Sequence, residues 1–90
     1  MGYRLTYTFT LVGMGVHYYF DETNTTRIKA TKNALTSAVE WLNEHSFPGI
    51  FTLYQDKYKV CDLSPDGEFS SWRSGGAWKP IAKFKDDYLN

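Results

Sequence analysis

The sequence predicts an α+β domain in which one amphipathic helix packs on one face of an antiparallel sheet, in the order β-β-β-α-β-β-(β). Two observations carry this prediction. Apolar and polar residues alternate over several short segments, which is the period of half-buried strands, whereas one central segment repeats its apolar residues every three or four positions. Because ninety residues suffice for one domain only, we expect residues 1–90 to form a single compact unit.

Strands are predicted throughout the first third of the chain. Tyr3–Leu11 alternates apolar residues with threonines, and Val16–Asp21 alternates in the same way after the glycine-containing loop Gly13–Gly15, which is typical of a hairpin. Glu22–Asn24 has the composition of a second turn. The alternation then resumes more briefly and predicts a third strand over Thr25–Thr31.

The helix is expected at about residues 33–45. Leu35, Ala38, Val39 and Leu42 have the spacing of an apolar stripe on a helix. Thr31 or Asn33 is the expected N-cap, because each side chain can accept a hydrogen bond from a free backbone N–H group of the first turn. Pro48 disfavours helical geometry at the residue before it, so the helix is expected to end before this proline.

After the helix the alternation returns, and it predicts strands over Ile50–Gln55, Lys57–Leu63 and, beyond a type I turn at Ser64–Gly67, Phe69–Arg73. Residues 78–90 leave two interpretations open. They form either an edge strand, where Pro80 is tolerated, or a terminal helical turn.

Composition narrows the classes of function. Ten Lys and Arg residues balance ten Asp and Glu residues, so no overall charge draws the protein toward nucleic acid or acidic lipid. No apolar run approaches the length of a membrane span, and the opening residues do not resemble a signal peptide, so we expect no membrane partner. The single cysteine, Cys61, cannot form an internal disulfide, which favours a cytoplasmic location.

No constellation of catalytic or metal-binding residues stands out. His17 is expected within a strand, His45 at the helix end and Cys61 in a later strand, and their spacing matches no metal site or nucleophile–base pair. The Gly13–Gly15 glycines lack the third glycine and the following helix of a dinucleotide-binding fingerprint. We therefore expect a protein with no cofactor, no metal and no catalytic residues.

The stretch Ser70–Pro80 has the composition of a contact surface. It places two tryptophans and two cations around a Ser-Gly-Gly turn, and Trp and Arg are enriched among the residues that dominate binding energy. The alternative is a hairpin whose tryptophans close a small core. Because Trp41 and six phenylalanines already fill that core, at least one of the two tryptophans is expected to be partly exposed. The predicted partner-binding residues are Trp72, Arg73, Trp78 and Lys79, with Tyr19 second.

The sheet face away from the helix offers an alternative site. If the apolar sides of all strands face the helix, the other side gathers threonines, one tyrosine and several cations. Such a face can bind single-stranded nucleic acid through phosphate contacts and base stacking, although outward Lys, Arg and Thr are also common on strands that only need to stay soluble. The residues of this alternative nucleic-acid face are Arg4, Arg27, Lys29, Lys57 and Lys59.

The leading hypothesis is a non-catalytic protein-interaction module. In length and layout the chain looks like the small α+β proteins that phages encode to bind and block host factors or defence machinery. This resemblance implies an inhibitor or adaptor that acts by steric occlusion in the host cytoplasm, and it assigns no residue a role. Three alternatives stay open: a single-stranded nucleic-acid-binding protein, a small ligand-binding domain or enzyme built on His17, His45, Cys61 and Asp62, and a homodimer paired through an exposed sheet edge or face.

Overall fold

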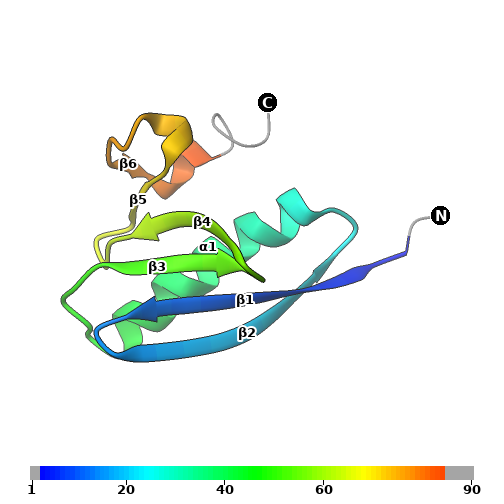
Figure 1. The fold of residues 1–90 in the computed structure, drawn as a ribbon, viewed down its shortest axis with the longest axis horizontal. Coiled ribbons are helices and arrows are strands. Elements are labelled where there is room, and N and C mark those ends of the chain that lie inside the picture. The colour runs from blue at the N-terminus through cyan, green and yellow to red at the C-terminus, as the bar shows by residue number, and fades with distance from the viewer. Residues whose placement is uncertain (1–2, 85–90) are drawn as a thin grey trace.

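The computed structural model describes residues 3–84 and confirms the predicted fold class, with a six-stranded antiparallel sheet and one helix among the described residues. The helix covers one face of the sheet and leaves the other face open (Figure 1). Along the sheet the strand order is β2-β1-β3-β4-β5-β6. The elements are β1 (Leu5–Gly13), β2 (Val16–Asn24), α1 (Arg27–Glu44), β3 (Phe51–Gln55), β4 (Tyr58–Leu63), β5 (Glu68–Ser70), the 3-10 turn η1 (Trp72–Ser74), β6 (Lys79–Pro80) and the 3-10 turn η2 (Ile81–Lys83).

The hairpin of β1 and β2 is the longest pairing in the sheet. Its nine pairs run without interruption from Leu5 opposite Asn24 to Gly13 opposite Val16. The two residues of its turn, Met14 and Gly15, have φ angles of 49° and 76°, which is the geometry of a type I′ turn and matches the twist of paired strands. The turn predicted at residues 22–24 is therefore wrong, because β2 continues through Asn24.

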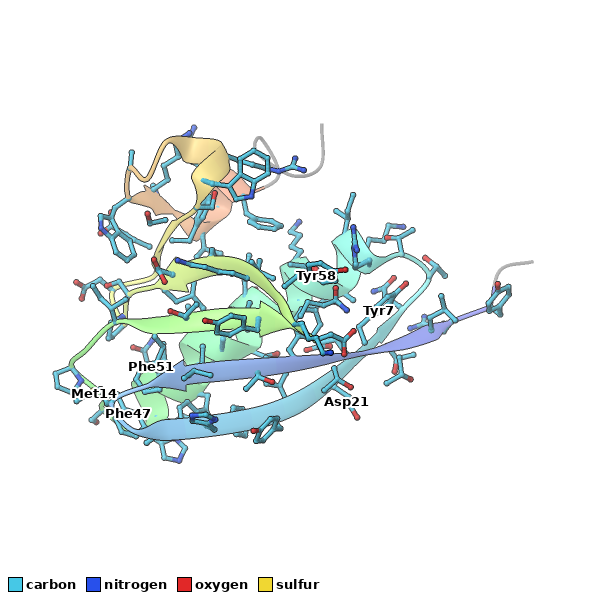
Figure 2. The ribbon with its side chains drawn as sticks, viewed as in Figure 1. Tyr7, Met14, Asp21, Phe47, Phe51 and Tyr58 are labelled. Atoms are coloured by element: carbon cyan, nitrogen blue, oxygen red, sulfur yellow. The ribbon has the colours of Figure 1, made fainter. Side chains whose placement is uncertain are left out.

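The core lies between α1 and the inner face of the sheet. Alanines on the helix let its backbone approach the strands closely, and phenylalanines and leucines from the strands fill the remaining space. At the end of the sheet where the β1–β2 hairpin turns, Phe47 packs on Phe51 with ring centroids 5.2 Å apart, near Met14 (Figure 2). The buried apolar side chains are Phe9, Leu11, Ala30, Ala34, Leu35, Ala38, Leu42, Phe51, Leu53, Cys61, Leu63, Phe69 and Phe84.

The third strand predicted over Thr25–Thr31 is wrong, because this segment forms the start of α1. Thr26 has an extended backbone and its side chain accepts a hydrogen bond from the Lys29 N–H, so Thr26 is the N-cap in place of Thr31 or Asn33. Ala30 and Thr31 are buried and extend the apolar stripe of the helix by a turn. Burial of that extra turn favours helix over a short strand.

The last two strands, β5 and β6, pair antiparallel over a short length. Phe69 lies opposite Lys79, and Pro80 lies on the edge strand β6. The strand expected to reach Arg73 ends at Ser70, because η1 begins at Trp72. Of the tail with two open interpretations, residues 79–80 are an edge strand, residues 81–83 are a 3-10 turn, and residues 85–90 lie outside the described residues.

Candidate functional site

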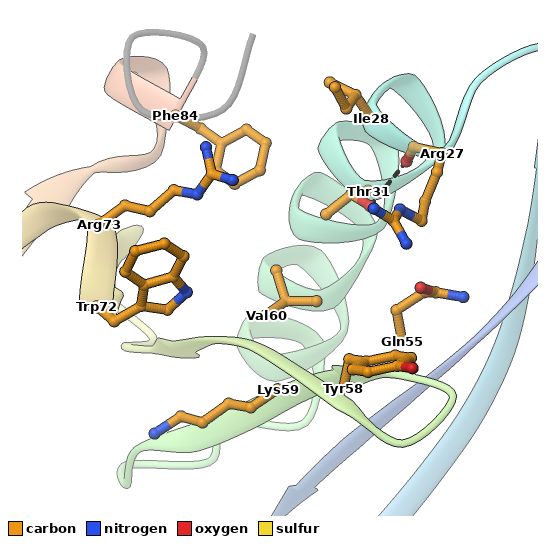
Figure 3. Close-up of a pocket in the computed structure, with 10 residues that line it drawn as sticks. All are labelled: Arg27, Ile28, Thr31, Gln55, Tyr58, Lys59, Val60, Trp72, Arg73 and Phe84. Atoms are coloured by element: carbon orange, nitrogen blue, oxygen red, sulfur yellow. Dashed lines mark hydrogen bonds between the residues drawn. The ribbon is translucent and has the colours of Figure 1, made fainter.

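A pocket of about 410 Å³ opens between the first turns of α1, strand β4 and the turn η1 (Figure 3). The start of α1 is far in sequence from β4 and η1, and it meets them only in the folded chain. Its size is at the lower end of the range of small-ligand pockets. The described residues that line it are Arg27, Ile28 and Thr31 from α1, Gln55 from β3, Tyr58, Lys59 and Val60 from β4, Trp72 and Arg73 from η1, and Phe84.

A β-bulge shapes the β4 wall of this pocket. Leu53 lies opposite Cys61 while Tyr54 lies opposite Lys59, so the register skips Val60. A bulge of this kind changes the direction of the side chains beside it. As a result Cys61 points into the core, whereas its neighbour Val60 lines the pocket.

The η1 wall is a hydrogen-bonded turn. The Gly75 N–H donates to the Trp72 carbonyl at 3.1 Å, and the Gly76 N–H donates to the Ser71 carbonyl at 3.0 Å. The Ser70 hydroxyl donates in turn to the Gly76 carbonyl at 2.8 Å. These bonds fix the backbone on both sides of Trp72, so its indole is presented by a defined local structure.

The pocket is electropositive. Figure 3 shows the guanidinium groups of Arg27 and Arg73 on opposite sides of it, and none of the described residues that line it is acidic. The Arg73 guanidinium also lies 5.1 Å from the centre of the Trp72 ring, within cation–π distance. Lys59 contributes its stem, because its ammonium group pairs with Asp62 at 3.3 Å. A ligand with a carboxylate or phosphate therefore fits the pocket better than a cation.

Two large rings stand at its rim. Trp72 is 77% exposed and Tyr58 is 71% exposed, above a floor that includes buried Phe84 and half-buried Val60. A second pocket of about 280 Å³ adjoins the first and shares Lys59, Val60 and Trp72 with it. Trp72 therefore forms a wall between the two pockets, and a partner that packs on both sides of this indole can occupy both pockets.

The predicted partner-binding residues are only partly in the two pockets. Trp72 and Arg73 line the main pocket, whereas Trp78 and Lys79 line neither pocket. Tyr19 lies on β2, which is separated from η1 by the width of the sheet. Trp78 is 41% exposed, so both tryptophans are exposed, in agreement with the expectation for at least one of them.

The prediction of a cationic open sheet face is wrong, because most of the cations assigned to it lie elsewhere in the fold. Arg27 and Lys29 belong to α1, Lys57 lies in the turn between β3 and β4, and Arg4 precedes β1. The pairing of β1 to β4 places one cation, Lys59, on the open face together with two carboxylates, Asp21 and Asp62. The first of these carboxylates accepts a hydrogen bond from Thr8 and the second pairs with Lys59. Of the residues predicted for this face, Arg27 and Lys59 line the pocket.

The three side chains considered for catalysis stay apart. His17 is exposed on the open face, and the His45 ring contacts the Trp41 carbonyl at 2.9 Å at the end of α1. Cys61 is buried, and its burial, followed by the neighbouring Asp62 carboxylate, raises the pKa of its thiol to about 12. The thiol is therefore protonated near neutral pH and is a poor nucleophile. Among residues 3–84, no three His, Cys, Asp or Glu side chains lie close enough to share a metal ion.

Sequence reasoning missed Tyr58, Ile28 and Val60 as members of the site. A signal for the bulge does exist. Val60 is an even-numbered apolar residue in a strand whose buried residues, Cys61 and Leu63, are odd-numbered, and strict alternation cannot place all three on one face.

No described helix is long and apolar enough to cross a membrane. Comparisons with protein-family models, curated proteins and solved structures gave no match, so the geometry of the site carries the functional argument.

Proposed function

We propose that the protein is a non-catalytic protein-interaction module, an inhibitor or adaptor that occludes a surface of its partner. Its contact site is the pocket beside Trp72, and the segment that it takes is acidic and carries an aromatic or large apolar side chain. The observation that carries this proposal is the combination, in one hollow, of two highly exposed rings and the Arg27 guanidinium, with no acidic residue among the described lining. Exposed Trp, Tyr and Arg at a concave site are the residues that most often dominate binding energy.

The mechanism follows from the geometry of Trp72. An apolar side chain of the partner packs on the indole and on the Val60 floor, while an adjacent carboxylate pairs with the Arg27 guanidinium. The apolar contact supplies most of the affinity, and the ion pair fixes the orientation of the bound segment. The bulk of the domain then covers the neighbouring surface of the partner. The single cysteine is buried as a free thiol, which is compatible with work in a reducing cytoplasm.

Charge placement favours a protein partner over single-stranded nucleic acid. A strand of nucleic acid needs a row of cations that follows successive phosphates. The open sheet face offers one cation beside two carboxylates, and Arg4, Lys29 and Lys57 do not line the pocket. The cationic character is thus concentrated at one hollow, which suits a short segment better than an extended backbone.

The test uses two pairs of matched variants and labelled peptides. The probe is a short fluorescent peptide of Asp and Glu residues around one Phe, and the control probe replaces the acids by Lys. Trp72→Ala should weaken binding of the acidic peptide by about tenfold or more, whereas Trp78→Ala, outside both pockets, should change it by less than about twofold. Arg27→Gln should weaken it as well, whereas Lys29→Gln, in the same helical turn, should not.

Equal binding of the acidic and basic peptides, or equal effects of the two tryptophan variants, would contradict this site. The nucleic-acid alternative is measured in the same assay with labelled oligothymidine. Its prediction is tight binding that weakens steeply as salt rises. Such binding, combined with no affinity for the acidic peptide, would replace the proposed function by the alternative.

A further inference from the structure

The two edges of the sheet differ in how they are protected. At one edge, β6 has only two residues and one of them is Pro80, so it offers little backbone to another strand. At the other edge (Figure 1), β2 has nine residues in unbroken register with β1. It carries two carboxylates, Asp21 and Glu22, and contains no proline, lysine or arginine. Proteins usually block a long exposed edge with such features, and an edge without them is a template for another strand.

The hairpin turn determines which backbone groups of β2 face outward. In a two-residue type I′ hairpin, the residues that flank the turn form a hydrogen-bonded pair, here Gly13 and Val16. Hydrogen-bonded and non-hydrogen-bonded pairs then alternate along the strands, so the even-numbered residues of β2 bond to β1. The N–H and C=O groups of the odd-numbered residues therefore point to the free edge. These residues are His17, Tyr19, Asp21 and Thr23.

From this pattern we infer that two copies of the chain pair antiparallel through β2, with the two-fold axis at Phe20, and form one continuous sheet. This register places Tyr19 opposite Asp21 of the second copy and His17 opposite its Thr23, so all four outward residues of each strand take part. A register centred on Tyr19 or on Asp21 uses only three of them. The register centred on Asp21 also places like carboxylates face to face, which is unfavourable.

Side chains along the edge complement one another in this register. Tyr19 is 64% exposed, and in the dimer it lies opposite Asp21 of the second copy. The Asp21 Oδ1 atom accepts a hydrogen bond from Thr8 of its own chain, whereas Oδ2 has no hydrogen bond with a described residue (Asp21 in Figure 2). On the inner face of the sheet, Tyr18 of one copy lies opposite Glu22 of the other, and the two copies of Phe20 lie opposite each other. Phe20 is only half-buried, whereas its neighbours Phe9 and Leu11 on β1 are fully buried. The second copy therefore covers the part of the core that one chain leaves open, which favours a second copy over an unrelated strand.

The inference does not depend on the proposed function. The pocket lies between the first turns of α1, β4 and η1, and β4 and η1 are toward the other edge of the sheet, so pairing through β2 leaves both pockets of the dimer accessible. A dimer would then present two identical sites and gain avidity for a partner with two segments.

Light scattering after size exclusion on the full chain tests the inference. The mass of one chain is 10.4 kDa, and the dimer has twice that value. Tyr19→Pro removes an N–H group that points to the free edge and leaves the bonds between β1 and β2 intact, so it should shift the protein to the mass of one chain. Tyr19→Thr, which keeps the N–H group and suits a strand, should remain dimeric. Unchanged circular dichroism shows that each variant is folded.

Cross-linking tests the register independently of the proline variant. Under mild oxidation, a mixture of Tyr19→Cys and Asp21→Cys chains should form mixed disulfides faster than Tyr19→Cys alone forms symmetric ones, while the buried Cys61 stays unreacted. A wild-type mass of one chain at all concentrations would overturn the inference. So would a dimer that survives Tyr19→Pro, or a symmetric Tyr19→Cys cross-link that forms faster than the mixed one.

Discussion

The Trp41 indole lies flat against the Tyr18 ring, with ring centroids 4.5 Å apart and planes only 6° apart. This stack joins the last turns of α1 to the inner face of β2. Trp41 also packs against Phe47, whose ring centroid lies 5.3 Å from its own, so the three rings form one aromatic cluster. One half-buried tryptophan thus connects the edge of the sheet, the helix and the loop that leads to β3.

We expect Trp41→Ala to lower the free energy of unfolding by about 3 kcal/mol, because it removes a large ring from a packed cluster. Trp41→Phe keeps a ring and should retain more than half of that stability. The interaction itself is isolated by a double-mutant cycle with Tyr18→Leu, in which the coupling should be about 1 kcal/mol. Urea unfolding measures the four proteins of the cycle and Trp41→Phe. Strictly additive effects would show that the stacked geometry contributes nothing beyond burial.

The start of α1 gives a second prediction. Thr26→Ala should lower the free energy of unfolding by about 1 kcal/mol, because the Lys29 N–H loses the side chain that accepts its hydrogen bond at 3.2 Å. Thr26→Ser keeps the acceptor and should be nearly neutral. Asn33→Ala, at an exposed position inside the helix, should be neutral or slightly stabilising. A larger loss for Asn33→Ala than for Thr26→Ala would return the helix start to the position that the sequence suggested.

That error has a physical origin. Thr26, Ile28 and Ala30 alternate as a strand does, yet Ala30, Ala34 and Ala38 also have helical spacing, and over so few residues the two periods overlap. Tertiary burial of Ala30 decides between them, and it does not appear in local sequence. The alternation of β1 and β2 is long enough to be unambiguous, and there both predicted strands are found, although β1 runs from Leu5 to Gly13 instead of from Tyr3 to Leu11 and β2 continues to Asn24.

The pocket was predictable only in part. Trp72 and Arg73 were identified by residue type, because exposed Trp and Arg are characteristic of binding surfaces. Their union with Arg27 depends on the tertiary fold, in which η1 and the first turns of α1 line the same pocket. Contacts of this kind come from packing between distant segments, and periodicity within one segment carries no information about them.

The third prediction concerns Cys61. Burial raises the pKa of its thiol from 9.0 to about 12, so the folded state holds this proton more tightly than the unfolded chain does. The resulting stability is fully present below pH 9 and is lost as the pH rises from there toward 12, at about 1.4 kcal/mol for each pH unit.

Cys61→Ala lacks the titrating group and is the matched control. Urea unfolding at several pH values should show the wild-type protein losing its advantage over Cys61→Ala above pH 9, the ordinary value for the thiol. Because tyrosines and lysines titrate in the same range in both proteins, only the difference between the two curves is informative. A difference that does not change with pH would contradict the raised pKa.

The last prediction connects the η1 turn to binding. Gly76 has a φ of 82°, and a Cβ atom added there would meet no atom within 4 Å, so the effect of a substitution comes from backbone strain alone. Gly76→Ala should lower the free energy of unfolding by about 1 kcal/mol, whereas Gly76→Asn, which tolerates this backbone region, should lower it by less. Because the Gly76 N–H and C=O groups bond to Ser71 and Ser70, just before Trp72, Gly76→Ala should also weaken binding of the acidic peptide more than Gly76→Asn does. Fluorescence anisotropy at a temperature where both variants are folded separates the two effects. Unchanged affinity in a destabilised Gly76→Ala protein would show that the site does not need the defined turn.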